Sequence, residues 1–245
     1  MQRSASRLSR VLACAAVPVM LVAAGCSSGS DSGDKGSGSK DQAASSASAS
    51  ASAKPTPTKT VEAAKFAKLP DVCKAVSAKT TAALVPKAKA KNGTTAESSD
   101  VTSRGGCSWN GLEDKGVKGS QYRWLDVSFY RYESDATLGS GQERATENYA
   151  KELAKFQGTQ GAKKLKTTAA AGVGDEASTV TYQLKKTDED FTYASVVART
   201  GNVLVLLSYN GAGYAGADGP SEKAISEGAL KAAKEAVAAV AVANK

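Results

Sequence analysis

The clearest hydrophobic pattern in the chain is an alternation between residues 121 and 132. Leu125, Val127 and Phe129 fall on one side of it, and four aromatic residues fall on the other: Tyr122, Trp124, Tyr130 and Tyr132. A period of two is the side-chain repeat of a β-strand. The pattern therefore predicts a strand with one aliphatic face and one aromatic face. A shorter strand is expected just before it, at Cys107 to Asn110.

The second half of the chain predicts three more strands, at 180–184, 191–199 and 203–209. These segments are rich in β-branched and aromatic residues, which favour strands. Only short polar turns, at 186–190 and 200–202, separate them. Turns of this length join antiparallel neighbours, so the three strands are expected to form a meander.

Helical signals begin after residue 68. Leu69-Pro70-Asp71 is expected to start a short helix that carries Cys73 and Val76. Ser77 has the chemistry of an N-cap for a second helix, which ends at Val85 because Pro86 cannot continue it. The polar stretch 87–103 that follows is typical of a surface loop.

Two longer helices are expected further on. Ser140 and Glu143 have the spacing of a capping box, and the helix that they begin runs to Gly158. The last helix, at about 221–242, has an apolar stripe at helical spacing: Ile225, Ala229, Ala232, Ala236 and Val240. Charged residues interrupt that helix, which favours packing against a core over spanning a membrane.

The expected element order is thus α-β-β-α-β-β-β-α within one domain at 61–245. This order predicts an α+β fold in which helices pack against an antiparallel sheet. The length is sufficient to bury a sizeable core.

The N-terminus reads as a targeting segment. Three arginines precede an apolar run at 11–24 that is short for a membrane span, and small residues lead to Cys26. Residues 1–25 resemble a bacterial lipoprotein signal. The resemblance implies cleavage before Cys26, lipidation of its thiol and a location on the outer face of the cell membrane. An ordinary secretory signal, which would leave Cys26 as a plain thiol, is one alternative. A noncleaved transmembrane anchor is a second, which the short apolar run disfavours.

Residues 26–60 have almost no apolar bulk. They consist mainly of Ser, Gly, Ala, Asp and Lys, followed by a Pro-Thr stretch. Such a segment cannot offset the entropy of ordering itself, so we expect a disordered linker between the lipidated N-terminus and the domain. Glycosylation of its hydroxyls is a further interpretation that the composition leaves open.

Charge argues against nucleic acid as a partner. The chain carries a net charge of +8, and three of its basic residues lie in the signal. The other basic residues are scattered among acidic ones and form no stripe, which is typical of a solvated surface.

Four cysteines separate by position. Cys14 lies in the signal and Cys26 is the lipid acceptor, which leaves Cys73 and Cys107 for an oxidising compartment. We expect these two to form a disulfide. Two buried free thiols are the alternative.

Several motifs in order resemble a known family. Pro70-Asp71-x-Cys73, Cys107-Ser108-Trp109, the segment 172–177 and Arg199-x-Gly201-Asn202-Val203 together resemble actinobacterial surface lipoproteins of the domain of unknown function 3558 family. The resemblance covers about residues 65–243. It implies an exported lipoprotein with the two cysteines bonded and a fold similar to the Mog1/PsbP type. It implies no activity.

Candidate chemistry is sparse. The chain has no histidine, which removes Ser-His and Cys-His nucleophile pairs and histidine metal sites. The carboxylates at 175–176 and 188–190 could serve a glycosidase-type reaction, but adjacent turn residues usually point apart. Gly172-Val173-Gly174 is too short for a dinucleotide fingerprint. We therefore expect no enzyme activity, metal site or cofactor.

The aromatic face of the 121–132 strand is the main candidate site, because aligned aromatic rings can stack sugars, peptides or lipid tails. The alternative is that a helix covers these rings as core. The favoured function is a noncatalytic binding or sensing domain at the cell envelope, with an envelope protein, a glycan or a lipid as ligand. Two alternatives stay open: a carboxylate-dependent hydrolase of cell-wall glycans, and a structural or partner-docking envelope protein.

Overall fold

The computed structural model describes residues 60–245. The signal at 1–25, Cys26 and nearly all of the linker at 26–60 lie outside the described residues. The described part is an α+β domain, as expected, built on one antiparallel sheet of seven strands. The strand order across the sheet is β1-β2-β3-β7-β6-β5-β4. The strands are β1 (Thr94–Thr95), β2 (Arg104–Glu113), β3 (Ser120–Arg131), β4 (Lys163–Ala169), β5 (Glu176–Lys186), β6 (Glu189–Thr200) and β7 (Val203–Tyr214).

Three α-helices and two short 3₁₀ turns complete the domain. The helices are α1 (Ala78–Leu84), α2 (Gly141–Gln157) and α3 (Glu222–Ala243), and the 3₁₀ turns are η1 (Val72–Lys74) and η2 (Gly116–Lys118). Their caps follow the sequence: Ser77, Ser140 and Ser221 each accept a hydrogen bond from a first-turn N–H, and Ser140 with Glu143 forms the predicted capping box.

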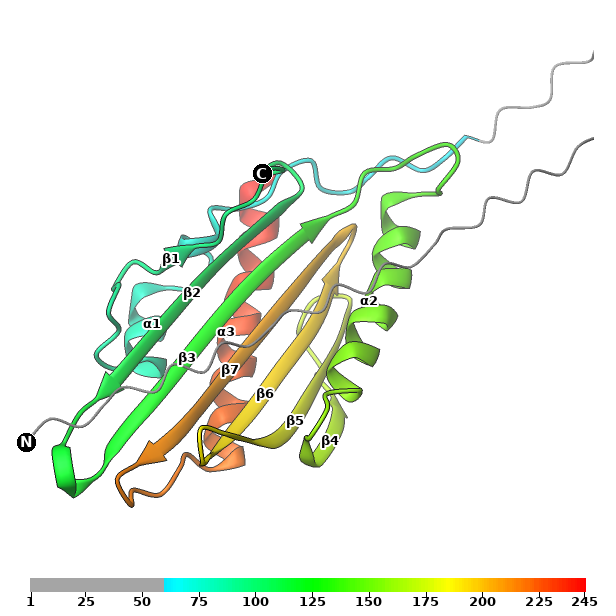
Figure 1. Cartoon of the computed structure of the whole chain (residues 1–245). Helices are drawn as coiled ribbons and strands as arrows, with labels where there is room; N and C mark the ends of the chain where they lie inside the picture. The colour runs from blue at the N-terminus through cyan, green and yellow to red at the C-terminus, as the bar shows by residue number, and fades with distance from the viewer. Residues whose placement is uncertain (1–59) are drawn as a thin grey trace, which may run out of the picture. The chain divides into compact units, whose positions relative to one another are not determined.

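The two long helices lie on opposite faces of the sheet (Figure 1). Alternate residues of each strand point to opposite faces, so the β3 alternation assigns each side chain to a helix. Leu125, Val127 and Phe129 are fully buried with the apolar stripe of α3. We call this side the α3 face. The other side, where Tyr149 of α2 packs on Val197 and Leu204, is the α2 face.

Four elements differ from the sequence-based expectation. The short helix expected around Cys73 and Val76 is only the single 3₁₀ turn η1. Strand β2 extends the segment predicted at 107–110 in both directions and includes Gly105 and Gly106, which pair with β3. Strands β1 and β4 are additional and lie at the two edges of the sheet, so the predicted order of the other elements is retained.

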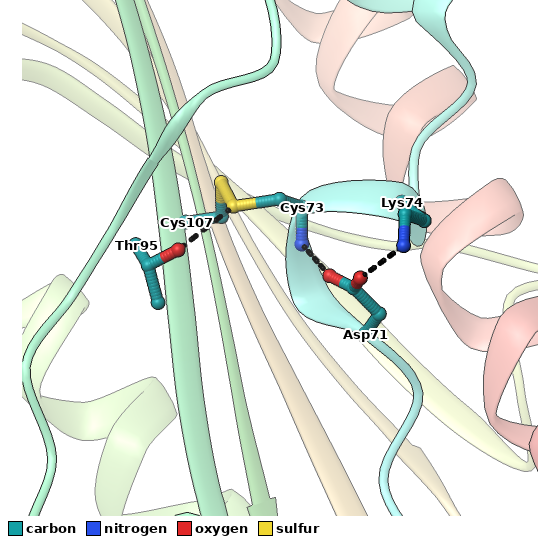
Figure 2. Close-up of a disulfide and its surroundings, with 5 residues drawn as sticks. All are labelled: Asp71, Cys73, Lys74, Thr95 and Cys107. Carbon is teal, nitrogen blue, oxygen red and sulfur yellow. Dashed lines mark hydrogen bonds and ion pairs between the residues drawn. A yellow bond between two sulfur atoms is a disulfide. The ribbon is translucent and has the colours of Figure 1, made fainter.

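The disulfide between Cys73 and Cys107 is confirmed (Figure 2). The bond joins η1 to the middle of β2, with the two Cα atoms 5.2 Å apart. Cys107 is buried, and the Cys73 sulfur lies 3.4 Å from the Thr95 hydroxyl. The bridge therefore fixes the segment that precedes α1 to the α3 face of the sheet.

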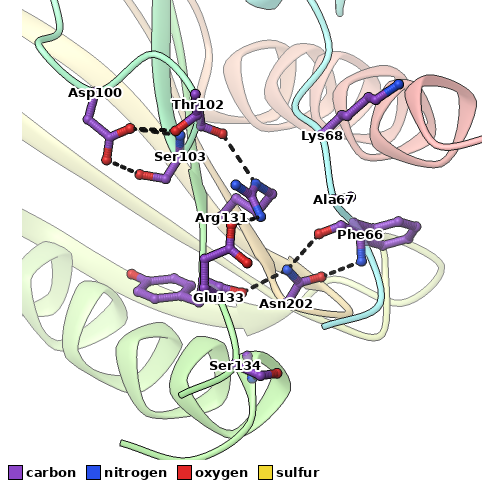
Figure 3. Close-up of polar contacts among 12 residues, drawn as sticks. Phe66, Ala67, Lys68, Asp100, Thr102, Ser103, Arg131, Glu133, Ser134 and Asn202 are labelled. Atoms are coloured by element: carbon purple, nitrogen blue, oxygen red, sulfur yellow. Dashed lines mark hydrogen bonds and ion pairs between the residues drawn. The ribbon is translucent and has the colours of Figure 1, made fainter. Parts of the chain in front are cut away.

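The chain enters the domain at the end of the sheet that holds the β6–β7 turn. Asn202 in this turn is fully buried, and its side chain hydrogen-bonds the N–H and the carbonyl of Phe66 as well as the carbonyl of Tyr132 (Figure 3). Gln142 at the start of α2 donates to the carbonyl of Ala63 nearby. Residues 62–66 are thus held beside the end of β3 that leads into α2.

None of the helices within residues 60–245 combines the length and the apolar character that a membrane crossing requires.

Candidate functional site

The aromatic residues of β3 divide into two pairs along the α2 face. Tyr130 and Tyr132 lie toward the end where α2 begins, and both pack against the cluster of Tyr149, Val197 and Leu204. Arg104 lies over the ring of Tyr130 and Arg144 over that of Tyr132, each at 5.8 Å. These two tyrosines are therefore part of the packing around α2, and Tyr130 also lines a small cavity of about 220 Å³.

Tyr122 and Trp124 lie toward the other end of β3. Trp124 is 38% exposed, which is high for a tryptophan in the middle of a seven-stranded sheet. A cavity of about 480 Å³ opens over the sheet here, and we call it the aromatic cleft. Its lining residues come from β3, the end of β5, the β5–β6 turn, β6 and β7: Tyr122, Trp124, Lys186, Thr187, Phe191, Tyr193, Asn210 and Tyr214. The volume is within the range of small-ligand sites.

The walls of the aromatic cleft are braced by ring contacts. Tyr122 meets Phe191 edge-on with centroids 5.9 Å apart, and Phe191 meets Tyr214 in the same way at 6.4 Å. Tyr193 is stacked on Tyr182 at 4.8 Å, with Lys186 Nζ 5.2 Å from its ring centre. Trp124, by contrast, contacts no other aromatic ring within residues 60–245. One face of its indole is thus available for stacking.

Two side-chain amides flank Trp124 across the sheet. The strand register places Asn110 of β2 opposite Trp124 on one side and Asn210 of β7 opposite it on the other. Asn210 is only 7% exposed, yet its side-chain amide has no hydrogen-bond partner among the described residues. The Asn210 amide atoms are not among the buried side-chain atoms that lack a partner, so water in the open cleft can bond them. A ligand that displaces this water must supply equivalent hydrogen bonds.

A polar row lies next to this one, toward α2. Ser108, Asp126 and Ser208 occupy it on β2, β3 and β7, and Ser208 also shares a hydrogen bond of 2.9 Å with Ser195. Burial raises the pKa of the Asp126 carboxyl, and a hydrogen bond from Ser128 only partly opposes that rise. Asp126 has no cationic partner in the described part of the chain.

A second cavity adjoins the aromatic cleft. It measures about 380 Å³, shares Tyr122 and Tyr214 with the cleft, and extends to Asn110 and Leu112 at the edge of β2. Burial raises the pKa of Tyr122, with smaller contributions from Tyr214 and Tyr193, so its hydroxyl keeps its proton at neutral pH. The surface that a ligand could contact therefore continues across three strands.

The other carboxylates considered from the sequence lie away from the aromatic cleft or at its outer rim. Asp175 accepts a hydrogen bond from the N–H of Gly201 at 2.6 Å and pairs with Arg199, which also faces Glu176. These contacts tie the start of β5 to the β6–β7 turn. The 188–190 carboxylates lie at the β5–β6 hairpin tip. Within residues 60–245, no cluster of three Cys, Asp or Glu side chains is suitable for holding a metal ion.

Sequence reasoning identified Tyr122 and Trp124 but missed Asn210, Asn110 and Asp126. The β3 alternation itself places Asp126 on the aromatic face, and that signal could have been used. Asn210 had no such local signal, because it reaches Trp124 only through the pairing of β3 with β7, strands more than seventy residues apart in the chain.

Comparison of the chain with protein-family models, with curated proteins and with solved structures finds no match. The resemblance to the domain of unknown function 3558 family, and to the Mog1/PsbP fold, therefore stays a prediction from the sequence motifs.

Proposed function

We propose that this chain is a noncatalytic binding domain, held at the outer face of the cell membrane by a lipid on Cys26, with the aromatic cleft as its ligand site. The observation that carries the proposal is the open position of Trp124, which is 38% exposed and lies in a cleft between the Asn210 side chain and a wall of aromatic rings. A tryptophan that served only the core would be shielded from solvent. A tryptophan on an ordinary surface would rarely lie in a cavity lined by aromatic side chains.

The position of the aromatic cleft supports the same proposal. The chain enters the domain beside Asn202, next to the end of β3 at Arg131, whereas the cleft lies at Tyr122 near the start of that strand. Nine residues of extended strand separate the two ends by about 30 Å. The cleft and the point where the N-terminal segment enters the domain thus lie at opposite ends of β3.

Replacement of the proposed lipid acceptor tests the anchor. Cys26→Ser is expected to move the protein from the membrane fraction to the medium, because the anchor proposal assigns membrane attachment to the lipid on this thiol. Cys14→Ser is the matched control and should leave the protein in the membrane fraction. A Cys26→Ser variant that still partitions with detergent and keeps its mobility would refute lipid anchoring.

Surface labelling tests the orientation. Lys118 is exposed in η2, between β2 and β3 at the cleft end of the sheet. A Lys118→Cys variant should react with a membrane-impermeant maleimide in intact cells as fully as after lysis. Labelling only after lysis would place the domain on the inner side and contradict the proposal.

A further inference from the structure

The lining of the aromatic cleft indicates the chemical class of its ligand, and this inference rests on the proposed function. The ligand must satisfy two different surfaces at once: a flat indole with a free face at Trp124, and polar groups on both sides of it at Asn110 and Asn210. A hexopyranose has both complements. Its ring C–H groups can lie on an aromatic face while its hydroxyls point outward in the ring plane as donors and acceptors.

The amide of Asn210 argues against an apolar ligand. An acyl chain in the aromatic cleft would displace water from an amide that has no hydrogen-bond partner among the described residues, and would give it no replacement. Vicinal hydroxyls would instead give the amide oxygen a donor and its nitrogen an acceptor. The next polar row offers Asp126, a carboxylate without a cationic partner, to further hydroxyl donors.

The sheet itself argues against an extended peptide. Peptides bind sheets mainly by adding a strand to an open edge, where main-chain hydrogen bonds provide affinity. The aromatic cleft lies over β3, β7 and β6, which are interior strands whose backbones pair with one another. The hydrogen bonds available to a ligand here come only from side chains.

We propose that the aromatic cleft binds a glycan chain, with one neutral pyranose stacked on Trp124 and hydrogen-bonded by Asn210 and Asn110. A second sugar unit extends into the adjoining cavity beyond Tyr122, because the two cavities share Tyr122 and Tyr214 as a common wall. The juxtaposition of an exposed indole with a side-chain amide on each side, neither hydrogen-bonded to another described residue, carries this inference.

Tryptophan fluorescence provides a direct readout. The chain has two tryptophans, and Trp109 is 1% exposed, so Trp124 is the one that solvent and ligands reach. The protein would be the full chain carrying Cys26→Ser, which lacks the lipid acceptor. The probes would be tetrasaccharides of glucose, N-acetylglucosamine, mannose and galactose, with an apolar naphthalene dye as the comparison ligand.

The expected result is a saturable change in Trp124 emission with at least one tetrasaccharide, and protection of Trp124 from acrylamide quenching. Trp124→Ala should abolish binding measured by calorimetry. Asn210→Leu, which keeps the volume and removes the amide, should weaken glycan binding about tenfold or more. Leu138→Ala, a change of another exposed apolar side chain on the loop before α2, is the matched control and should bind normally.

Other outcomes overturn the inference in distinguishable ways. If the dye binds in a Trp124-dependent manner, Asn210→Leu binds it as well or better, and no tetrasaccharide binds, then the glycan assignment fails while a binding cleft remains. If neither the dye nor any sugar responds to Trp124→Ala, both the assignment and the proposed site fail. A dimer in sedimentation that Trp124→Ala dissociates would identify a second copy as the occupant and refute the glycan.

Discussion

The side-chain amide of Asn202 brackets Phe66: it accepts a hydrogen bond from the Phe66 N–H at 2.8 Å and donates one to the Phe66 carbonyl at 3.0 Å. The same nitrogen donates to the carbonyl of Tyr132 at 2.8 Å. One buried side chain thus connects the entering chain, the β6–β7 turn and the segment after β3.

Removal of the three hydrogen bonds of the Asn202 side chain should destabilise the domain. Asn202→Ala leaves three backbone groups without their partner in a buried site, so we expect the free energy of unfolding to fall by about 3 to 5 kcal/mol. Urea denaturation followed by circular dichroism gives the measurement. Asn244→Ala is the matched control, because Asn244 makes four comparable bonds, to Ala67, Lys68 and Val240, but is half-buried. An equal loss in the control would contradict the role of burial.

Loss of the disulfide should also destabilise the domain. The bridge spans 34 residues, and replacement of Cys73 and Cys107 by Ala is expected to lower the free energy of unfolding by about 2 to 5 kcal/mol. The variant should become sensitive to trypsin. Cleavage should be favoured at 87–91, because the loop that follows α1 carries exposed lysines there. Chemical reduction of the unmodified protein should give the same digestion pattern. Two free thiols in the exported protein by nonreducing mass spectrometry would contradict the bridge.

The burial of the Asp126 carboxyl should make the free energy of unfolding depend on pH. Burial raises the pKa of its carboxyl in the folded state above the ordinary value of 3.8. The fold therefore favours the protonated form, and stability falls as the pH rises through that raised pKa. Asp126→Asn should stabilise the protein at pH 7, and the gain should diminish as the pH is lowered toward 3.8. A gain that stays constant with pH would show that the carboxyl charge is not its cause.

The Glu235 carboxyl should make the free energy of unfolding depend on pH in the opposite direction. Burial alone would raise the pKa of this α3 carboxyl, but hydrogen bonds from Thr80 and from Ser77 outweigh burial and lower it below 4.5. Stability from these bonds is present above pH 4.5 and is lost as the pH falls through the lowered pKa. Glu235→Gln should therefore reduce stability at pH 7 by about 1 kcal/mol, with little difference at pH 2. Thermal unfolding of both proteins across this pH range checks the sign.

Local patterns were sufficient to predict much of this fold. The alternation in β3, the caps at Ser77, Ser140 and Ser221, and the stripe of α3 each depend on neighbours within a few residues, and each appears in the structure. Strand β4 was missed because six of its seven residues are exposed and three are lysines, so no apolar alternation marks it. The first part of β2 was missed because Gly105 and Gly106 have no side chains that could show an alternation.

The candidate site was less predictable because it depends on which strands become neighbours. Sequence order would place β3 beside β4, whereas the sheet pairs β3 with β7. Only this pairing brings Asn210 to Trp124 and Tyr214 to Tyr122. The split between the two pairs of β3 aromatics likewise follows from how far α2 extends over the sheet, which the β3 sequence does not encode.

The order of Phe66 and Cys73 along the chain determines how the domain responds to mechanical force. A pull on the N-terminal segment acts first on the hydrogen bonds between Phe66 and Asn202, which can be peeled one after another. Beyond them the pull reaches Cys73, whose covalent bond to Cys107 transfers the force directly into the middle of β2. Extension through residues 60–73 is thereby limited to about 45 Å. Force applied to the N-terminal segment therefore bypasses residues 74–106 and acts directly on β2 and its ladder with β3.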